Sequence, residues 1–203
     1  MAKSNFLKVT SPKGEAFYPY LKSPEMYEGN PVGFTIQAAF GKKDTEALIK
    51  TLEAELERAK GGPAFKGKTW QKEPAMGYRE KPDGTIMFKF KTKHEYERDG
   101  ETIKRKVPIF DAKGKPDNDV NIGNGSTVKI AFQVVPFWKS ARNNGVTLYL
   151  DAVQVLELKE YSGGGSAGAY GFGEEEGYEA EPNGSERFTD EEYQQGDEGD
   201  GEF

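Results

Sequence analysis

The charges of this chain are divided between two segments, and the division limits what each segment can fold into. Residues 160–203 contain 14 Asp and Glu but a single basic residue, Arg187, whereas residues 1–159 contain 27 Lys and Arg against 20 Asp and Glu. An acidic, glycine-rich segment with few apolar residues cannot bury enough apolar surface to fold alone. We therefore expect one folded domain, residues 1–159, followed by a flexible, disordered acidic tail, residues 160–203.

Composition excludes several kinds of site. The chain has no cysteine and one histidine, His94, which excludes disulfides, thiolate nucleophiles and metal sites built from cysteines or several histidines. The sequence shows neither a signal peptide nor an apolar run long enough to cross a membrane. We expect a soluble, cytoplasmic protein without a membrane partner.

Apolar residues alternate with polar ones in several segments, which is typical of half-buried strands. This pattern predicts strands at residues 6–10, 32–40, 85–93, 103–109, 128–138 and 146–158. Residues 16–31 contain prolines and aromatic residues in no regular order, and they look too irregular for a single element. Residues 64–82 are expected to form a loop.

A single helix is predicted between the second and third of these strands. Asp44 is the expected N-cap, an apolar stripe is formed by Leu48, Leu52 and Leu56, and Gly61 begins the stop signal. Several short strands, turn signals between them and one amphipathic helix favour a small α+β or mainly β barrel.

Catalytic motifs are weak in this sequence. Neither a phosphate-binding P-loop nor a strand-linked G-x-G-x-x-G is present. The polar run 117–121 lacks the final glutamate of a calcium loop. Asp111 and Asp119 could hold a metal in a nuclease, but loop carboxylates are far more often plain surface residues. We expect no enzyme activity, no cofactor and no metal.

Basic and aromatic residues are interleaved in a way that favours binding of nucleic acid. If strands 85–93 and 103–109 pair, their lysines share one sheet face, next to a loop that mixes cations with rings. The candidates from these segments are Trp70, Tyr78, Arg79, Lys89, Lys91, Lys93, Lys104 and Lys106.

Two adjacent rings, Phe137 and Trp138, end the next strand and are followed by Lys139 and Arg142. Neighbouring residues of a strand point to opposite faces, so at most one of these rings belongs to the core. The other is a candidate platform for base stacking.

An ordered series of short motifs is similar to a known family. The motifs are MAK at the start, GNPVG at 29–33, FKFK at 88–91, DAKGK at 111–115, IGNGS at 122–126, VPF at 135–137 and DGEF at the end. With these motifs in this order, the chain resembles the single-stranded DNA-binding proteins of tailed bacteriophages with a compact replisome, which have an acidic tail ending in phenylalanine.

The resemblance implies a five-stranded Greek-key OB-fold barrel that coats single-stranded DNA without sequence specificity and assists annealing in replication, recombination and repair. Contact residues carry over at Lys3, Lys91 and Phe137. The family's basic residues are replaced at Val32 and Ala131, so Lys129, Lys139, Arg142 or the loop 66–79 must complete the set.

The resemblance also implies that the tail contacts the replicative polymerase and the helicase-primase, in the cytoplasm of the infected bacterial host. The expected partner-binding residues are Asp197, Glu198, Asp200, Glu202 and Phe203. Both a monomer and a homodimer stay open. The rival interpretation is an acidic-tailed DNA mimic or chaperone-like protein whose body does not bind DNA; a carboxylate-dependent nuclease is the third.

Overall fold

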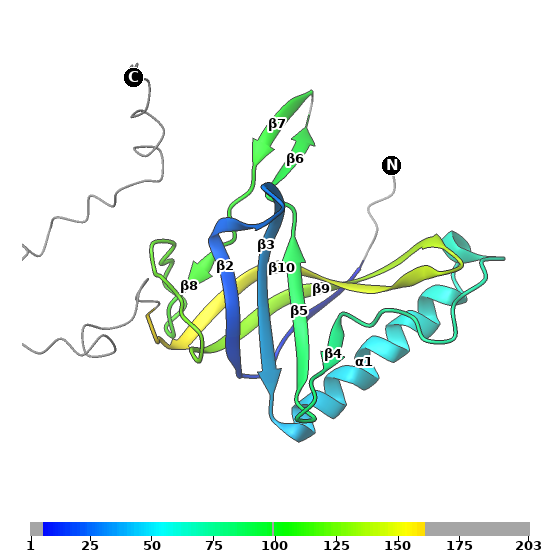
Figure 1. Ribbon diagram of the computed structural model, residues 1–203, viewed down its shortest axis with the longest axis horizontal. Helices are drawn as coiled ribbons and strands as arrows, with labels where there is room; N and C mark the ends of the chain where they lie inside the picture. The colour runs from blue at the N-terminus through cyan, green and yellow to red at the C-terminus, as the bar shows by residue number, and fades with distance from the viewer. Residues whose placement is uncertain (1–5, 99, 161–203) are drawn as a thin grey trace, which may run out of the picture. The chain divides into compact units, whose positions relative to one another are not determined.

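The computed structural model describes residues 6–98 and 100–160, which all belong to one unit of the chain, Met1–Gly163. Figure 1 shows its elements. In chain order they are β1 (Leu7–Thr10), β2 (Gly14–Tyr27), β3 (Asn30–Phe40), α1 (Lys42–Lys60), the 3₁₀ turn η1 (Pro63–Phe65), β4 (Tyr78–Glu80), β5 (Ile86–Thr92), β6 (Glu95–Arg98), β7 (Glu101–Lys104), β8 (Ile109–Phe110), β9 (Thr127–Ser140) and β10 (Asn143–Glu157).

Five strands close into a barrel. β2 pairs with β3, β3 with β5, β5 with β10, β10 with β9, and β9 again with β2. The β5–β10 pair is parallel and the other four are antiparallel. β1, β4 and β8 extend the sheet outside this ring. A five-stranded Greek-key barrel of this order is an OB-fold, as the resemblance implied.

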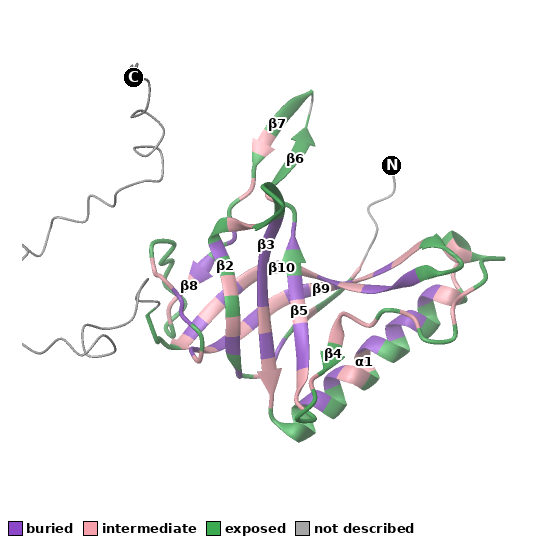
Figure 2. Ribbon diagram, in the orientation of Figure 1, coloured by how far each residue is buried: buried purple, intermediate pink, exposed green. Residues whose placement is uncertain are grey.

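The barrel interior is filled by the apolar residues of the alternating strands. Phe88 and Phe90 of β5 are fully buried, and the Phe90 ring lies 4.9 Å from that of Phe132 on β9. Buried and less buried positions alternate along the strands in Figure 2. The alternation in the sequence therefore identified the core face of β3 and β5 correctly.

Helix α1 packs its leucine stripe against the barrel. Leu48, Leu52 and Leu56 are buried, and the helix ends at Gly61, as predicted. The predicted N-cap is wrong: the helix begins at Lys42, its N-cap is Gly41, and Asp44 lies in the first turn. The first turn is closed by the backbone, since the amide of Thr45 donates to the carbonyl of Gly41. None of the helices in the described part of the chain is both long and apolar enough to span a membrane.

The segment expected to be irregular is a strand with interruptions. β2 pairs with β3 near both of its ends, but the register shifts between Phe17 and Tyr20 and again between Tyr20 and Glu25. Tyr18 has a positive φ of 48°, and its amide donates to Oδ1 of Asn124 at 2.7 Å. The local signals thus predicted the irregularities, whereas long-range pairing keeps the strand together.

The prediction that the strands around Lys89 and Lys104 pair is wrong. β5 lies between β3 and β10, while β7 pairs with β6 in a separate two-stranded sheet. Residues 95–98 form a strand of their own, and Arg98 pairs with Glu101. Lys104 and Lys106 therefore do not share a sheet face with Lys89 and Lys91.

Candidate functional site

A hollow of about 380 Å³ opens on the outer surface of the barrel, over β3, β5 and β10. Its lining includes residues from five separate segments, and cations and rings meet there. Of the residues singled out in the sequence, it contains Tyr78, Arg79, Lys89, Lys91 and Phe137.

Strand register explains why the lysines gather. Lys89 is paired with Gln37 of β3, and Lys91 is paired with Thr35 of β3 and with Tyr149 of β10. Side chains alternate along a strand, and the neighbours of these lysines, Phe88 and Phe90, are in the core. The lysines must therefore point outward.

One side of the hollow is lined by residues 75–79, which end the segment 69–79 that we call the wall. Asn144 of β10 holds it in place. Asn144 is fully buried. Its backbone carbonyl accepts hydrogen bonds from the amide of Ala75 at 3.0 Å and from Nε2 of Gln71 at 3.1 Å. Its side-chain Nδ2 donates to the carbonyl of Ser140 at 2.9 Å. Satisfied buried networks of this kind rigidify their surroundings.

Two glycines let the wall lie close to the barrel. A Cβ on Gly77, where φ is +72°, would sit 2.7 Å from Cγ of Leu148. A Cβ on Gly145 would clash with the backbone of Ala75, whose carbonyl accepts from the amide of Val146 at 2.7 Å. The wall covers Met87, which is 1% exposed although it lies on the lysine side of β5.

Lys89 forms an ion pair with a carboxylate. Nζ of Lys89 lies 2.9 Å from Oε2 of Glu25 on β2, and the hydroxyl of Thr35 donates to the same oxygen at 2.9 Å. Burial acts to raise the pKa of the Glu25 carboxyl, but the hydrogen bonds from Lys89 and Thr35 and the charges of Lys89 and Lys91 outweigh it and hold that pKa below its ordinary value. Lys91 has no ion pair within the described residues.

Neither of the two adjacent rings belongs to the core. Phe137 is partly exposed and lines the hollow. Trp138 points to the other side, where its Nε1 donates to the carbonyl of Thr69 at 2.9 Å and Nζ of Lys68 lies 4.3 Å from its ring centroid. Phe137 is therefore the ring available to a ligand of the hollow, and Trp138 anchors the wall.

The two aromatic candidates of the loop also pack against the protein. Trp70 lies against the core, with its ring 5.5 Å from that of Phe65. Tyr78 has its ring 5.4 Å from that of Phe88 and also lines the hollow. Burial, and next the nearby charge of Glu53, raise the pKa of the Tyr78 hydroxyl.

Several predicted cations lie outside the hollow. Lys93 follows the end of β5, and Lys139 and Arg142 lie at or next to the exposed turn between β9 and β10. Lys129 lies eight residues from Phe137, which is roughly 26 Å along an extended strand. Lys104 and Lys106 lie at or beyond the end of β7. Lys3 and the tail residues Asp197, Glu198, Asp200, Glu202 and Phe203 lie outside the described residues.

The sequence interpretation missed four lining residues that matter for the shape of the hollow: Gln37, Gly77, Met87 and Thr147. A signal existed for three of them. Gln37 alternates with the core residues Ile36 and Ala38. Met87 alternates with the core residues of its strand and so falls on the lysine face, and Thr147 alternates with Val146 and Leu148. Gly77 had none, because its importance comes from contact with Leu148 of a distant strand.

This arrangement suits a ligand that is both anionic and planar. Ammonium and guanidinium groups bind phosphates, and a partly exposed ring such as Phe137 offers a stacking surface. Within residues 6–98 and 100–160, no three His, Asp or Glu side chains are grouped so that they could hold a metal ion.

The chain is similar to phage proteins along most of its length. A family model described as the single-stranded DNA-binding protein of bacteriophage T7 matches residues 37–158. The single-stranded DNA-binding protein of Escherichia phage T7 is 32% identical over 189 residues, which cover 81% of this chain and 80% of that protein. Its counterpart from Enterobacteria phage T3 is 30% identical over 172 residues, covering 73% and 74%.

The fold is also similar to those of solved phage proteins. The crystal structure of gp2.5, a single-stranded DNA-binding protein encoded by bacteriophage T7, matches with a TM-score of 0.64 and 27% identity, and covers 87% of this chain and 100% of that one. The single-stranded DNA-binding protein of bacteriophage Enc34, solved in complex with single-stranded DNA, has a TM-score of 0.55 and 14% identity, covering 77% and 89%. At that identity the second match concerns the fold alone.

Proposed function

The chain belongs to the family of the bacteriophage T7 single-stranded DNA-binding protein, and from this premise we propose that it binds single-stranded DNA in the hollow over β3, β5 and β10. The observation that carries the proposal is the meeting of Phe137 with Lys89, Lys91 and Arg79 around one cavity. The cations contact phosphates, and the Phe137 ring stacks on a base.

Contacts of these two kinds carry little sequence information. Every base has a face on which a ring can stack, at ~1–3 kcal/mol per base, and phosphates are the same along the strand. The protein therefore coats single strands without sequence specificity. Strands covered in this way are kept free of secondary structure, which supports annealing to a complementary strand.

The acidic tail has a second role in this proposal. Residues 160–203 carry 14 Asp and Glu and one Arg, opposite in sign to residues 1–159. A tethered polyanion competes with DNA for the cations of the barrel, because the tether keeps it at a high effective concentration. The last strand, β10, ends at Glu157, which supports placing the border of the domain near residue 159.

Released by DNA, the tail recruits the replicative polymerase and the helicase-primase in the host cytoplasm. Its final residues, Asp197, Glu198, Asp200, Glu202 and Phe203, offer a ring and several carboxylates to an apolar pocket rimmed by cations. Deletion of Phe203 alone should leave the affinity for DNA within about twofold while abolishing most of the retention of a purified polymerase. Equal retention of both proteins would remove this part of the proposal.

Titration of labelled oligo-dT with and without Mg²⁺ tests the main proposal. We expect saturable binding that weakens with salt; three to five phosphate contacts give a log–log slope of roughly −2 to −3.5. Absence of binding by a protein truncated after residue 160 would favour the DNA-mimic interpretation. Shortening of the oligonucleotide on addition of Mg²⁺ would indicate a nuclease.

A further inference from the structure

An arginine lies against two tyrosine rings beside the hollow. The guanidinium carbon of Arg105, just after β7, lies 5.3 Å from the ring centroid of Tyr96 on β6 and 5.3 Å from that of Tyr149 on β10. Both distances are within the range of cation–π attraction. We call these three residues the column; it connects the β6–β7 hairpin to the barrel.

The column contains an unused hydrogen-bonding group. Nε of Arg105 is buried and has no hydrogen-bond partner. No carboxylate in the described part of the chain forms an ion pair with this guanidinium. A buried donor without an acceptor costs folding free energy, and a guanidinium has five donors in a fixed fork that matches a phosphate.

The column continues the surface of the hollow. Tyr149 is paired with Lys91, which lines the hollow. Directly opposite residues of a hairpin lie on the same face, so Tyr96, which pairs with Ile103, is on the face that Arg105 shares. Glu95 and Glu97 alternate with Tyr96 and lie on the opposite face of the hairpin. Glu101 lies on the column face, because it alternates with Ile103 and pairs with Arg98. The column face of the hairpin therefore carries aromatic and arginine side chains together with one carboxylate.

We propose that the column is a second contact site for single-stranded DNA, for the part of the strand that leaves the hollow next to Lys91. The inference rests on the proposed function. Two rings lie against the guanidinium, and Arg105 is only partly buried, so its terminal nitrogens bind a phosphate. The ring of Tyr96, a residue 38% exposed, is free to stack on a base.

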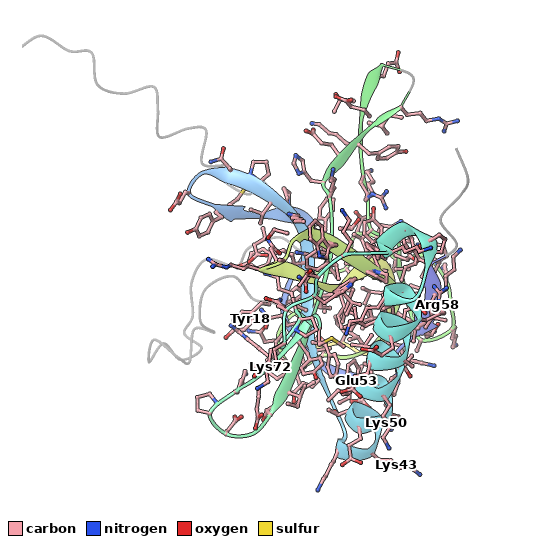
Figure 3. All side chains as sticks on the ribbon, turned by 90° about the vertical axis from the view of Figure 1, so that its right-hand side faces the viewer. Tyr18, Lys43, Lys50, Glu53, Arg58 and Lys72 are labelled. Atoms are coloured by element: carbon pink, nitrogen blue, oxygen red, sulfur yellow. The ribbon has the colours of Figure 1, made fainter. Side chains whose placement is uncertain are left out.

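Two variants separate these contacts. Arg105→Gln should make the log–log salt slope of oligo-dT binding less negative by about 0.7, which is one phosphate contact. Tyr96→Leu keeps an apolar side chain but loses the ring; it should weaken binding about fivefold or more and leave the slope unchanged. Lys43→Gln is the matched control, because Lys43 is an exposed cation of α1, labelled in Figure 3, that forms no ion pair with any described residue. It should change neither quantity.

Variants of the hollow, measured beside those of the column, separate failure of this inference from failure of the proposed function. If Phe137→Ala and Lys91→Gln weaken binding while Arg105→Gln and Tyr96→Leu match wild type, the column only fastens the hairpin and the inference is overturned. If Arg105→Gln lowers the melting temperature but not the affinity, the same conclusion follows. If the wild-type protein does not bind oligo-dT, the proposed function fails, and the inference with it.

Photo-crosslinking of the unmodified protein gives a readout that does not depend on variants. Oligo-dT carrying 5-iodouracil should form crosslinks on Tyr96 as well as on Phe137, identified by mass spectrometry of the digested complex. Crosslinks on Phe137 without any on Tyr96 would overturn the inference and leave the proposed function standing.

Discussion

At the scale of single residues, the two adjacent rings have different tasks. Phe137→Ala should weaken binding of oligo-dT by ~1–3 kcal/mol with little change in the salt slope, since stacking carries no charge. Trp138→Ala should mainly lower stability, because it removes the hydrogen bond to Thr69 and the ring beneath Lys68. Affinity at several salt concentrations, together with thermal melting, separates the two. A Phe137→Ala protein that unfolds would show that this ring is structural.

Glu25 forms an ion pair with Lys89 and so competes with phosphates for this cation. Removal of the carboxylate should therefore strengthen binding of oligo-dT. Glu25→Gln should tighten oligo-dT binding and make the salt slope more negative by up to about 0.7, as one more cation becomes available. Glu28→Gln is the matched control, because it removes an equal charge from the β2–β3 turn at an exposed residue that has no ion pair in the described part of the chain. An identical gain in both variants would show that only net charge matters.

The same carboxylate gives a pH dependence. Because the folded protein lowers the pKa of Glu25 below its ordinary value of 4.5, its contribution to stability is present above about pH 4.5 and is lost as the pH falls through the lowered value. The difference in urea midpoint between wild type and Glu25→Gln should therefore shrink at low pH. A difference that grows on acidification would contradict this assignment.

At the scale of elements, the hollow keeps its shape only while the wall stays in its place against the barrel. Gly77→Ala should destabilise the protein and weaken oligo-dT binding, because the new Cβ would press on Leu148 and push the wall outward. Gly84→Ala is the control: φ there is +80°, but nothing lies within 4 Å of an added Cβ, so it costs only backbone strain. Urea unfolding and oligo-dT titration of both proteins test this. Equal effects would show that the contact with Leu148 is unimportant.

Elements with a strict local pattern could be predicted, and those defined by distant partners could not. The alternation around Phe88 and Phe90 and the leucine stripe of α1 each identify a buried face without knowledge of the partner. The hairpin β6–β7 was misplaced because pairing depends on which strand lies nearby, and sequence periodicity does not contain that information.

In the candidate site, too, residues with a local sequence pattern could be predicted and contacts between distant segments could not. Lys91 and Phe137 were identified from motifs, and strand alternation placed the lysine outward. Their meeting in one hollow depends on the pairing of β5 with β10 and of β10 with β9. The column was not predicted, since Arg105 comes from one connection and Tyr149 from a strand more than forty residues later.

At the scale of the whole molecule, the opposite charges of the two segments should be visible in binding. Deleting residues 163–203 should tighten oligo-dT binding at low salt and have little effect at high salt, because screening reaches about 8 Å at physiological ionic strength. The measurement is the ratio of affinities of the full-length and truncated proteins across salt concentrations. A ratio of one at low salt would show that the tail does not compete with DNA.

The location of the bound strand is the central claim, and the methionines allow it to be tested in one measurement. The chain has four methionines: Met76 and Met87 line the hollow, Met26 is exposed near the turn between β2 and β3, and Met1 lies outside the described residues. With ¹³C-methyl-methionine labelling, addition of oligo-dT should shift the Met76 and Met87 signals more than that of Met26. Binding that moves Met26 while Met76 and Met87 stay in place would contradict the account.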